Sequence, residues 1–170
     1  MNMKRGLALL MSMALAVLLL SACGKEEHQT SGFMGDTLET WWFDMTLEDA
    51  YLCDGYEDYA PSPGYRLLVA EMTVKNCTVE SIPMIREDFP VVWESDGEMM
   101  GVYPISAFTD EQLPDEYSLG IDRSRSGLLV YEVPDDVVDF DILFTEYFIE
   151  EDGTESEGET FNIAFTPEER

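Results

Sequence analysis

Basic residues and histidine are scarce in this chain of 170 residues, which contains 9 Lys+Arg and one His. Nucleic-acid-binding proteins neutralise phosphates with clustered Lys and Arg, so the composition excludes a nucleic-acid partner. The one histidine, His28, precedes every segment with a strand-like pattern. A Ser–His or Cys–His hydrolase needs a rigidly held histidine base and a zinc site needs several N or S ligands, so both are excluded.

Acidic and apolar residues are abundant instead. The chain has 36 Asp+Glu, a formal net charge of −27, 45% hydrophobic residues and 12% aromatic residues. A disordered acidic tail would be less apolar, so we expect one domain with a packed core. A glycosidase would need a cleft and a carboxyl with a raised pKa in addition to paired carboxylates. A solvated acidic surface explains the carboxylates better, and we expect no enzymatic activity.

The first 23 residues have the pattern of a bacterial lipoprotein signal peptide. Lys4 and Arg5 precede an uncharged apolar stretch, Leu7–Leu20, which is too short to span a membrane comfortably. The stretch ends in the sequence LSAC, in which small residues stand directly before Cys23 and resemble a lipobox. We predict cleavage before Cys23 and transfer of a diacylglycerol to its thiol. An ordinary signal peptide with an incidental cysteine is the alternative.

Lipidation determines where we expect the protein. Two or more acyl chains anchor a protein firmly, so membrane lipid is the first predicted partner and the outer face of the bacterial cytoplasmic membrane is the predicted location. Cleavage removes two basic residues and no acidic one, which changes the formal charge to −29. Residues 24–35 are polar and lack an apolar period, so we predict a flexible tether with a typical reach of roughly 20 Å.

Lipidation also accounts for the odd number of cysteines, because three minus Cys23 leaves Cys53 and Cys77. The strand pattern places these two at opposite ends of a predicted hairpin. Twelve strand residues at ~3.3 Å each separate them, whereas bridged Cα atoms lie within ~7 Å. We therefore predict two free thiols.

Alternation of apolar and polar residues dominates the rest of the chain, and no stretch has a helical period. The alternating segments include residues 43–48, 68–75, 138–148 and 160–165. Alternation of this kind is typical of antiparallel sheets with one solvated face. Seven to nine short strands separated by turn signals predict an all-β fold, a two-sheet antiparallel sandwich over residues 36–166, with a short tail at 167–170.

Three local signals refine the strand assignment. Pro90 cannot donate a hydrogen bond to a ladder, so we expect its strand at a sheet edge. The Asp96-Gly97 pair predicts a tight hairpin. Residues 106–118 are polar and irregular, and we expect a short helical turn there.

Several motifs resemble one family. They are GDT at 35–37, PGYRLLV at 63–69 leading into a strand that ends VKN at 74–76, and SGLLVYEVP at 126–134. The chain is similar over residues 35–166 to the immunoglobulin-like lipoprotein domain known as domain of unknown function 4352, which is common in Gram-positive bacteria. The resemblance implies an immunoglobulin-like β-sandwich that is extracytoplasmic and usually tethered to the membrane. It implies no catalytic residues.

Two acidic clusters are candidates for weak calcium binding, because hard cations prefer carboxylate and carbonyl oxygens. Asp135, Asp136, Asp139 and Asp141 form the first, in which a turn is followed by one strand face. Residues 150–159 form the second. Neither has the EF-hand spacing, and a solvated acidic face is the simpler interpretation. No cofactor is required by the sequence beyond the lipid on Cys23.

Aromatic residues give the second candidate site. Tyr51, Tyr56, Tyr59 and Tyr65 bracket a long acidic connection, and tyrosine-rich loops on sandwiches are typical recognition surfaces. The alternative is that these rings pack back over the sheet edge.

The tryptophans and methionines are expected to pack rather than to bind a ligand. One of the neighbouring Trp41 and Trp42 should face the core while the other covers an edge. The methionines after the signal segment are expected to pack in the core: Met45, Met72, Met84, Met99 and Met100.

The sequence as a whole predicts a membrane-anchored extracytoplasmic lipoprotein that acts as a non-catalytic binding or interaction module. Its expected partner is an envelope protein or surface ligand of unknown identity. A calcium-stabilised structural module and a small-ligand carrier are the alternatives. An apolar pocket would favour the carrier.

Overall fold

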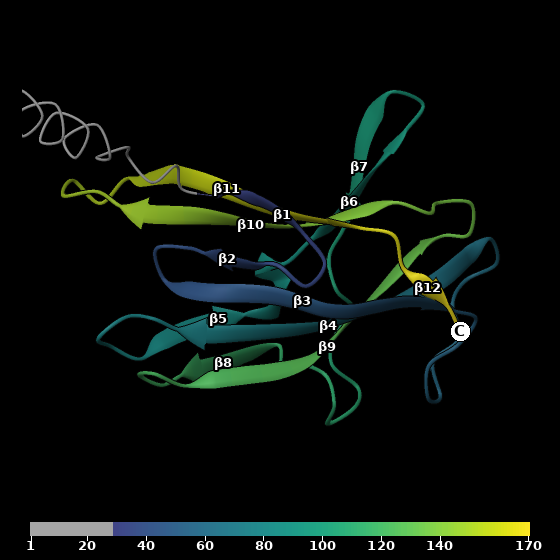
Figure 1. Ribbon diagram of the computed structural model, residues 1–170, viewed down its shortest axis with the longest axis horizontal. Helices are drawn as coiled ribbons and strands as arrows, with labels where there is room; N and C mark the ends of the chain where they lie inside the picture. Colours follow the sequence, from purple (N-terminus) through teal and green to yellow (C-terminus); the bar gives the residue numbers. More distant parts are fainter. Residues whose placement is uncertain (1–28) are drawn as a thin grey trace, which may run out of the picture.

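The computed structural model describes residues 29–170, which form two β-sheets packed face to face (Figure 1). The all-β, immunoglobulin-like sandwich is therefore confirmed. Within these residues there is no α-helix, and a single 3-10 turn, η1, spans Arg86–Asp88. The predicted signal peptide, the lipidation site Cys23, the first part of the tether and His28 lie outside the described residues.

The first sheet has the strand order β1-β11-β10-β6-β7. Its strands are β1 (Ser31–Phe33), β6 (Val91–Ser95), β7 (Glu98–Val102), β10 (Phe140–Ile149) and β11 (Glu155–Phe165). The second sheet has the order β12-β3-β4-β9, with β2 also paired to β3. Its strands are β2 (Thr37–Glu39), β3 (Phe43–Cys53), β4 (Tyr65–Asn76), β9 (Ser124–Pro134) and β12 (Glu168–Glu169). A separate ribbon pairs β5 (Ile82–Ile85) with β8 (Glu116–Leu119).

The domain boundaries differ from the predicted ones. Residues 29–170 contain twelve strands, because five strands of at most four residues escape a count based on alternation. The predicted tether at 24–35 ends early, since β1 pairs with β11 in parallel. The predicted tail at 167–170 is also wrong, since β12 pairs with β3 and Arg170 forms an ion pair with Asp49 at 2.9 Å.

Two local predictions differ from the structure for physical reasons. β6 lies between β10 and β7 and is no edge strand. Pro90 precedes its first residue, so the missing N–H interrupts no ladder, and the Pro90 carbonyl accepts a bond from the Leu143 N–H at 3.0 Å. The helical turn predicted within 106–118 is reduced to one hydrogen-bonded turn, in which the Gln112 N–H donates to the Thr109 carbonyl at 3.4 Å, and no helical element forms there. The segment from Ile105 to Leu113 instead runs along the edge of β9, with which it forms three backbone hydrogen bonds.

The core fills the space between the inner faces of the two sheets. The aromatic rings of Phe43, Phe89 and Phe144 contact one another there, with centroid separations of 4.7 to 6.0 Å. Tyr131 in the motif strand β9 is fully buried, and its hydroxyl donates to the Phe89 carbonyl at 2.8 Å. Burial raises the pKa of the Tyr131 hydroxyl far above its ordinary value. This tyrosine thus ties the second sheet to the segment that follows η1.

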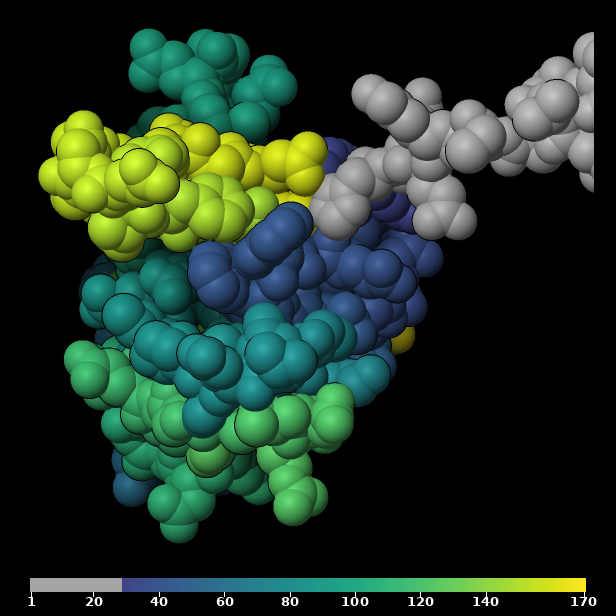
Figure 2. Space-filling view, turned by 90° about the vertical axis from the view of Figure 1, so that its left-hand side faces the viewer, coloured from purple at the N-terminus to yellow at the C-terminus, as the bar shows by residue number. Residues whose placement is uncertain are grey.

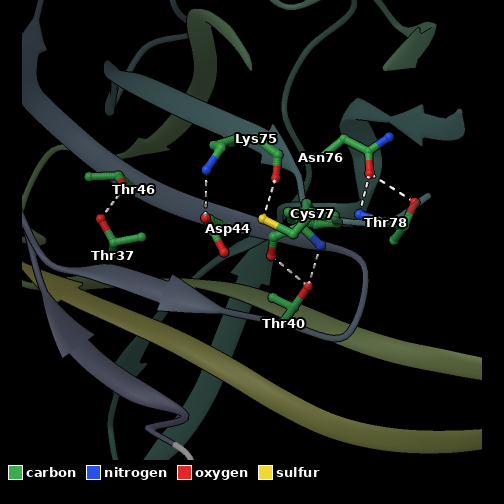
Figure 3. A network of polar contacts seen from close by, with 9 residues as sticks. Thr37, Thr40, Asp44, Thr46, Lys75, Asn76, Cys77 and Thr78 are labelled. Atoms are coloured by element: carbon green, nitrogen blue, oxygen red, sulfur yellow. Dashed lines mark hydrogen bonds and ion pairs between the residues drawn. The ribbon is translucent and has the colours of Figure 1, made fainter. Parts of the chain in front are cut away.

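The cysteine prediction is confirmed, because Cys53 and Cys77 are both free. The antiparallel register pairs Cys53 with Leu67 at one end of the β3–β4 hairpin and Phe43 with Asn76 at the other. Cys77 lies next to Asn76 at that far end (Figure 3). Burial raises the pKa of both thiols, so neither is an activated nucleophile.

Candidate functional site

An apolar cavity of about 340 Å³ opens at one end of the sandwich, and we call it the end pocket. It lies where the start of β3, the β5 ribbon, η1 and the far half of β10 come together. Figure 2 faces this end, where the lime end of β10, the blue start of β3 and teal segments near β5 meet. Nine residues line it: Trp42, Phe43, Ile82, Pro83, Met84, Asp88, Phe144, Thr145 and Tyr147.

The aromatic wall lies beside a buried acid in β10. Glu146 continues the inward-facing positions of this strand and is only 5% exposed, and the pairing with β11 shifts in register there, between Thr145 and Tyr147. The Glu146 carboxylate accepts the backbone N–H of Trp41 at 2.6 Å. This bond holds the turn before β3 against the first sheet.

The same turn is closed from within by Thr40. Its hydroxyl accepts the Trp42 N–H at 3.1 Å. It also accepts the Phe43 N–H at 3.0 Å and donates to the Phe43 carbonyl at 2.8 Å (Figure 3). Trp42 is half-buried against the core, whereas Trp41 is 70% exposed. Both rings pack on Phe148. The prediction that one of the two tryptophans faces the core is confirmed by Trp42. Cover of a sheet edge by Trp41 stays a prediction.

The opposite wall is held by Asn76, the residue that ends the VKN motif. Its side-chain amide donates to the carbonyls of Glu80 and Leu119 at 2.7 and 2.9 Å, and its oxygen accepts from Thr78 (Figure 3). These bonds fix the loop between β4 and β5. They thereby place Met84 and its neighbours opposite the aromatic wall.

The electrostatic character of the end pocket comes from Asp88, the only lining residue with a carboxylate. None of the nine lining residues is basic. Partial burial raises the pKa of the Asp88 carboxyl above its ordinary value of 3.8. An apolar, aromatic cavity with one carboxylate suits a ligand with an apolar body and a positive charge.

The tyrosine cluster has a structural explanation. The rings of Tyr56 and Tyr59 pack on Phe108, with centroids 6.0 and 5.4 Å away. Their hydroxyls donate to the carboxylates of Glu111 and Glu132 at 2.7 and 3.1 Å. Burial and the Glu111 bond raise the pKa of Tyr56 to about 12.

These rings and Tyr51 cover a second apolar cluster on the outer face of the second sheet, built from Cys53, Leu67, Val69 and Val130. The guanidinium of Arg170 lies 4.5 Å from the Tyr51 ring. Tyr65 is 46% exposed and does not belong to this cluster. The structure therefore brings three of the four candidate tyrosines together and favours packing over recognition.

The acidic calcium candidates are not brought together. Within residues 29–170 no three His, Cys, Asp or Glu side chains lie close enough to hold a metal ion. Asp139 precedes β10 and accepts a bond from Thr166, and Asp141 accepts the Asn162 amide at 3.0 Å. Asp135 and Asp136 lie in the turn after β9. The convergence expected for Asp135, Asp136, Asp139 and Asp141 is therefore not found, and residues 150–159 form no metal-binding group within the described residues either.

The methionine prediction holds for Met45, Met72 and Met84, which are buried. Met99 and Met100 on β7 are instead 67% and 46% exposed. Two residues of the end pocket and its wall, Glu146 and Asp88, were not predicted from the sequence. The sequence does contain a hint for Glu146, because this acid stands where the inward positions of Phe140, Ile142 and Phe144 predict an apolar residue. No sequence pattern marks Asp88.

Comparisons with known proteins support the fold. No known family model matches the sequence, and no curated protein matches it. The fold is similar to that of the "putative lipoprotein" YcdA from Bacillus subtilis, with a TM-score of 0.53 and 18% identity over 81% of this chain. It is also similar to the YjhA protein from Bacillus subtilis, with a TM-score of 0.50 and 16% identity over 66% of this chain and 79% of that one.

The match to YcdA covers 39% of that protein's length. At these identities the likeness shows a shared sandwich, and membership of the domain of unknown function 4352 family stays a prediction. Within residues 29–170 no helix has the length and apolar character needed to cross a membrane.

Proposed function

We propose that this protein is an extracytoplasmic lipoprotein whose sandwich is a non-catalytic binding module for small organic cations. The anchor is the diacylglycerol on Cys23, and the location is the outer face of the bacterial cytoplasmic membrane. The basic start, the 14-residue apolar stretch and the LSAC sequence support this part. The shared fold with YcdA, described as a "putative lipoprotein", is in keeping with it.

The end pocket is the observation that carries the binding function. Four of its nine lining residues are aromatic, which gives a ligand large apolar contact area. Asp88 supplies the negative charge at a position where the side chain remains exposed to an incoming ligand. Aromatic faces and a carboxylate together favour an ammonium group over a neutral or anionic one. This observation favours the small-ligand carrier over a tyrosine-loop interaction module.

Binding is tested with three probes of similar size: benzyltrimethylammonium, benzyl alcohol and benzoate. We expect the cation to bind the full chain in the millimolar range and to shift the NMR signal of the Trp42 indole. Asp88→Asn should weaken it up to about fivefold, the contribution of a partly exposed ion pair. Asp136→Asn, a turn carboxylate outside the end pocket, is the matched control. Equal binding of all three probes, or no shift with any of them, would refute the proposal.

The anchor is tested separately, by labelling expressing cells with a tagged fatty acid. We expect the label on the wild-type chain and its loss in Cys23→Ser, with release of the protein from the membrane fraction. Cys77→Ser, which removes the exposed thiol of the sandwich, is the control and should stay labelled. Label retained in the Cys23 variant would show that the lipobox interpretation is wrong.

A further inference from the structure

The hairpin of β6 and β7 extends beyond the rest of the first sheet. It stands out as a teal projection at the top of Figures 1 and 2. Four of the five residues of β7 are exposed, and Val102 is half-buried. Within residues 29–170 no strand pairs with the outer side of β7, so it is a free edge.

The hairpin geometry identifies the backbone groups on this edge. Asp96 and Gly97 have φ angles of 53° and 81°, a two-residue turn that makes Ser95 and Glu98 a hydrogen-bonded pair. Hydrogen-bonded and non-bonded pairs alternate along an antiparallel ladder. Met99 and Gly101 are therefore non-bonded positions, and their N–H and C=O groups point away from β6.

Soluble proteins usually protect such an edge with Lys, Pro, a bulge or a covering segment. The edge of β9 follows this rule, because the segment from Ile105 to Leu113 covers it with three backbone bonds. β7 has none of these devices. Its sequence EMMGV contains no Lys or Pro, and its pairing with β6 runs without a bulge.

The charged residues around β7 are all acidic. Residues 91–103 contain Glu94, Asp96 and Glu98 and no basic residue. The depression beside Met99 is lined by Glu94, Asp139 and Asp141, again without a basic residue. A second copy of this chain would bring a formal charge of −27 against the same acids. A positively charged polypeptide would be attracted to them.

We propose that β7 is a β-augmentation site that adds an extended, lysine- or arginine-bearing segment of another polypeptide to the first sheet. Backbone bonds to Met99 and Gly101 supply the pairing, and the exposed methionines supply apolar contact. The flanking carboxylates select basic side chains. This site is distinct from the end pocket and does not depend on it.

The probe is a seven-residue peptide of alternating lysine and valine with blocked ends. Two matched peptides replace lysine with glutamate or carry N-methyl groups on alternate residues, which removes the hydrogen bonds of one edge. Amide hydrogen exchange of the full chain is followed by NMR. We expect the lysine peptide to slow exchange at Met99 and Gly101 by about tenfold or more, with little change at Met100, whose N–H already bonds β6.

Met99→Pro should abolish this protection, because it removes one outward donor without breaking the ladder to β6. Met99→Ala keeps the donor and should retain the protection. If Met99→Pro fails to fold, the comparison of the lysine peptide with the N-methylated peptide on the wild-type chain tests the same hydrogen bonds. The proposal is overturned if the lysine peptide gives no protection, or if the glutamate or N-methylated peptide protects Met99 and Gly101 equally well. It is also overturned if protection appears without peptide and grows with protein concentration, which would indicate pairing with a second copy.

Discussion

Replacing Asn76 tests how the end pocket is held. Asn76 is fully buried at the end of β4, and its side chain makes four hydrogen bonds. Two go from the amide to the carbonyls of Glu80 and Leu119, and two come from the Thr78 N–H and hydroxyl. Asn76→Ala removes all four. The Leu119 carbonyl then keeps one donor, the Ser81 hydroxyl at 3.3 Å, and the Glu80 carbonyl keeps the Thr78 hydroxyl at 2.9 Å.

The magnitude follows from which partners can reach water. Glu80 is exposed, so its carbonyl is rehydrated, whereas Leu119 is 3% exposed and its carbonyl keeps only the Ser81 hydroxyl. Each ordinary hydrogen bond contributes about 1 kcal/mol, and water and Ser81 offset part of the loss of four. We therefore expect Asn76→Ala to lower the free energy of unfolding by about 2–4 kcal/mol. For a domain of this size the corresponding fall in Tm is roughly 6–12 °C.

Urea unfolding followed by circular dichroism measures this change. Thr37→Ala is the matched control, because the Thr37 hydroxyl bonds Thr46 at 2.8 Å on an exposed surface. Its loss should cost about 0.5 kcal/mol or less. Hydrogen exchange should also speed up across β5 in the Asn76 variant, because its entry loop is no longer fixed. A free energy of unfolding for Asn76→Ala within about 0.5 kcal/mol of the Thr37→Ala value would refute the reasoning.

Four further outcomes are expected. Glu146→Ala should destabilise the protein by about 1–3 kcal/mol in urea unfolding, while Glu146→Gln, which keeps an acceptor for the Trp41 N–H, should recover most of this. Gly127→Ala should cost about 1–3 kcal/mol in the same assay, because its Cβ would lie 2.9 Å from a backbone nitrogen of the covering segment. Tyr59→Ala should lower Tm by several degrees, as expected for a packed ring, whereas the exposed Tyr65→Ala should leave it unchanged. Binding of benzyltrimethylammonium should weaken up to about fivefold on acidification, at a pH above 3.8, because the raised pKa of Asp88 makes its carboxylate take up a proton early. A titration with Asp88→Asn should be flat.

Much of the fold follows from local pattern. The alternation at 68–75 correctly predicted strand β4, and the Asp96-Gly97 pair correctly predicted the β6–β7 hairpin. Both signals involve residues that are close in the sequence, so they can be interpreted without knowing the partner strands. The separation of Cys53 and Cys77 followed from the same hairpin reasoning.

The end pocket could not be predicted in this way. Its walls come from positions near 42, 84 and 145, and nothing local links them. The short strands β1 and β12 pair in parallel with distant partners and bury too few side chains to show a period. The edge placement inferred from Pro90 failed because a proline one residue before a strand interrupts no ladder.

The placement of buried polar groups shows which part of the sandwich is built with most constraint. Only five polar or charged side chains are buried in residues 29–170: Thr40, Asn76, Arg86, Gln112 and Glu146. Burial of such groups is costly unless they are bonded, so each marks a segment that needs fixing. Gln112 accepts bonds from the segment that covers β9. The other four hold the walls of the end pocket.

Thr40 and Glu146 fix the turn that carries Trp42, and Asn76 fixes the loop into β5. Arg86 pairs with Asp115 from within η1, the turn that presents Asp88. A sandwich that needed only stability would gain more from apolar residues at these positions, since replacing buried polar groups by packed apolar ones is often neutral or stabilising. Four of five buried polar groups around one cavity therefore favour a cavity whose shape matters, which is what a binding site requires.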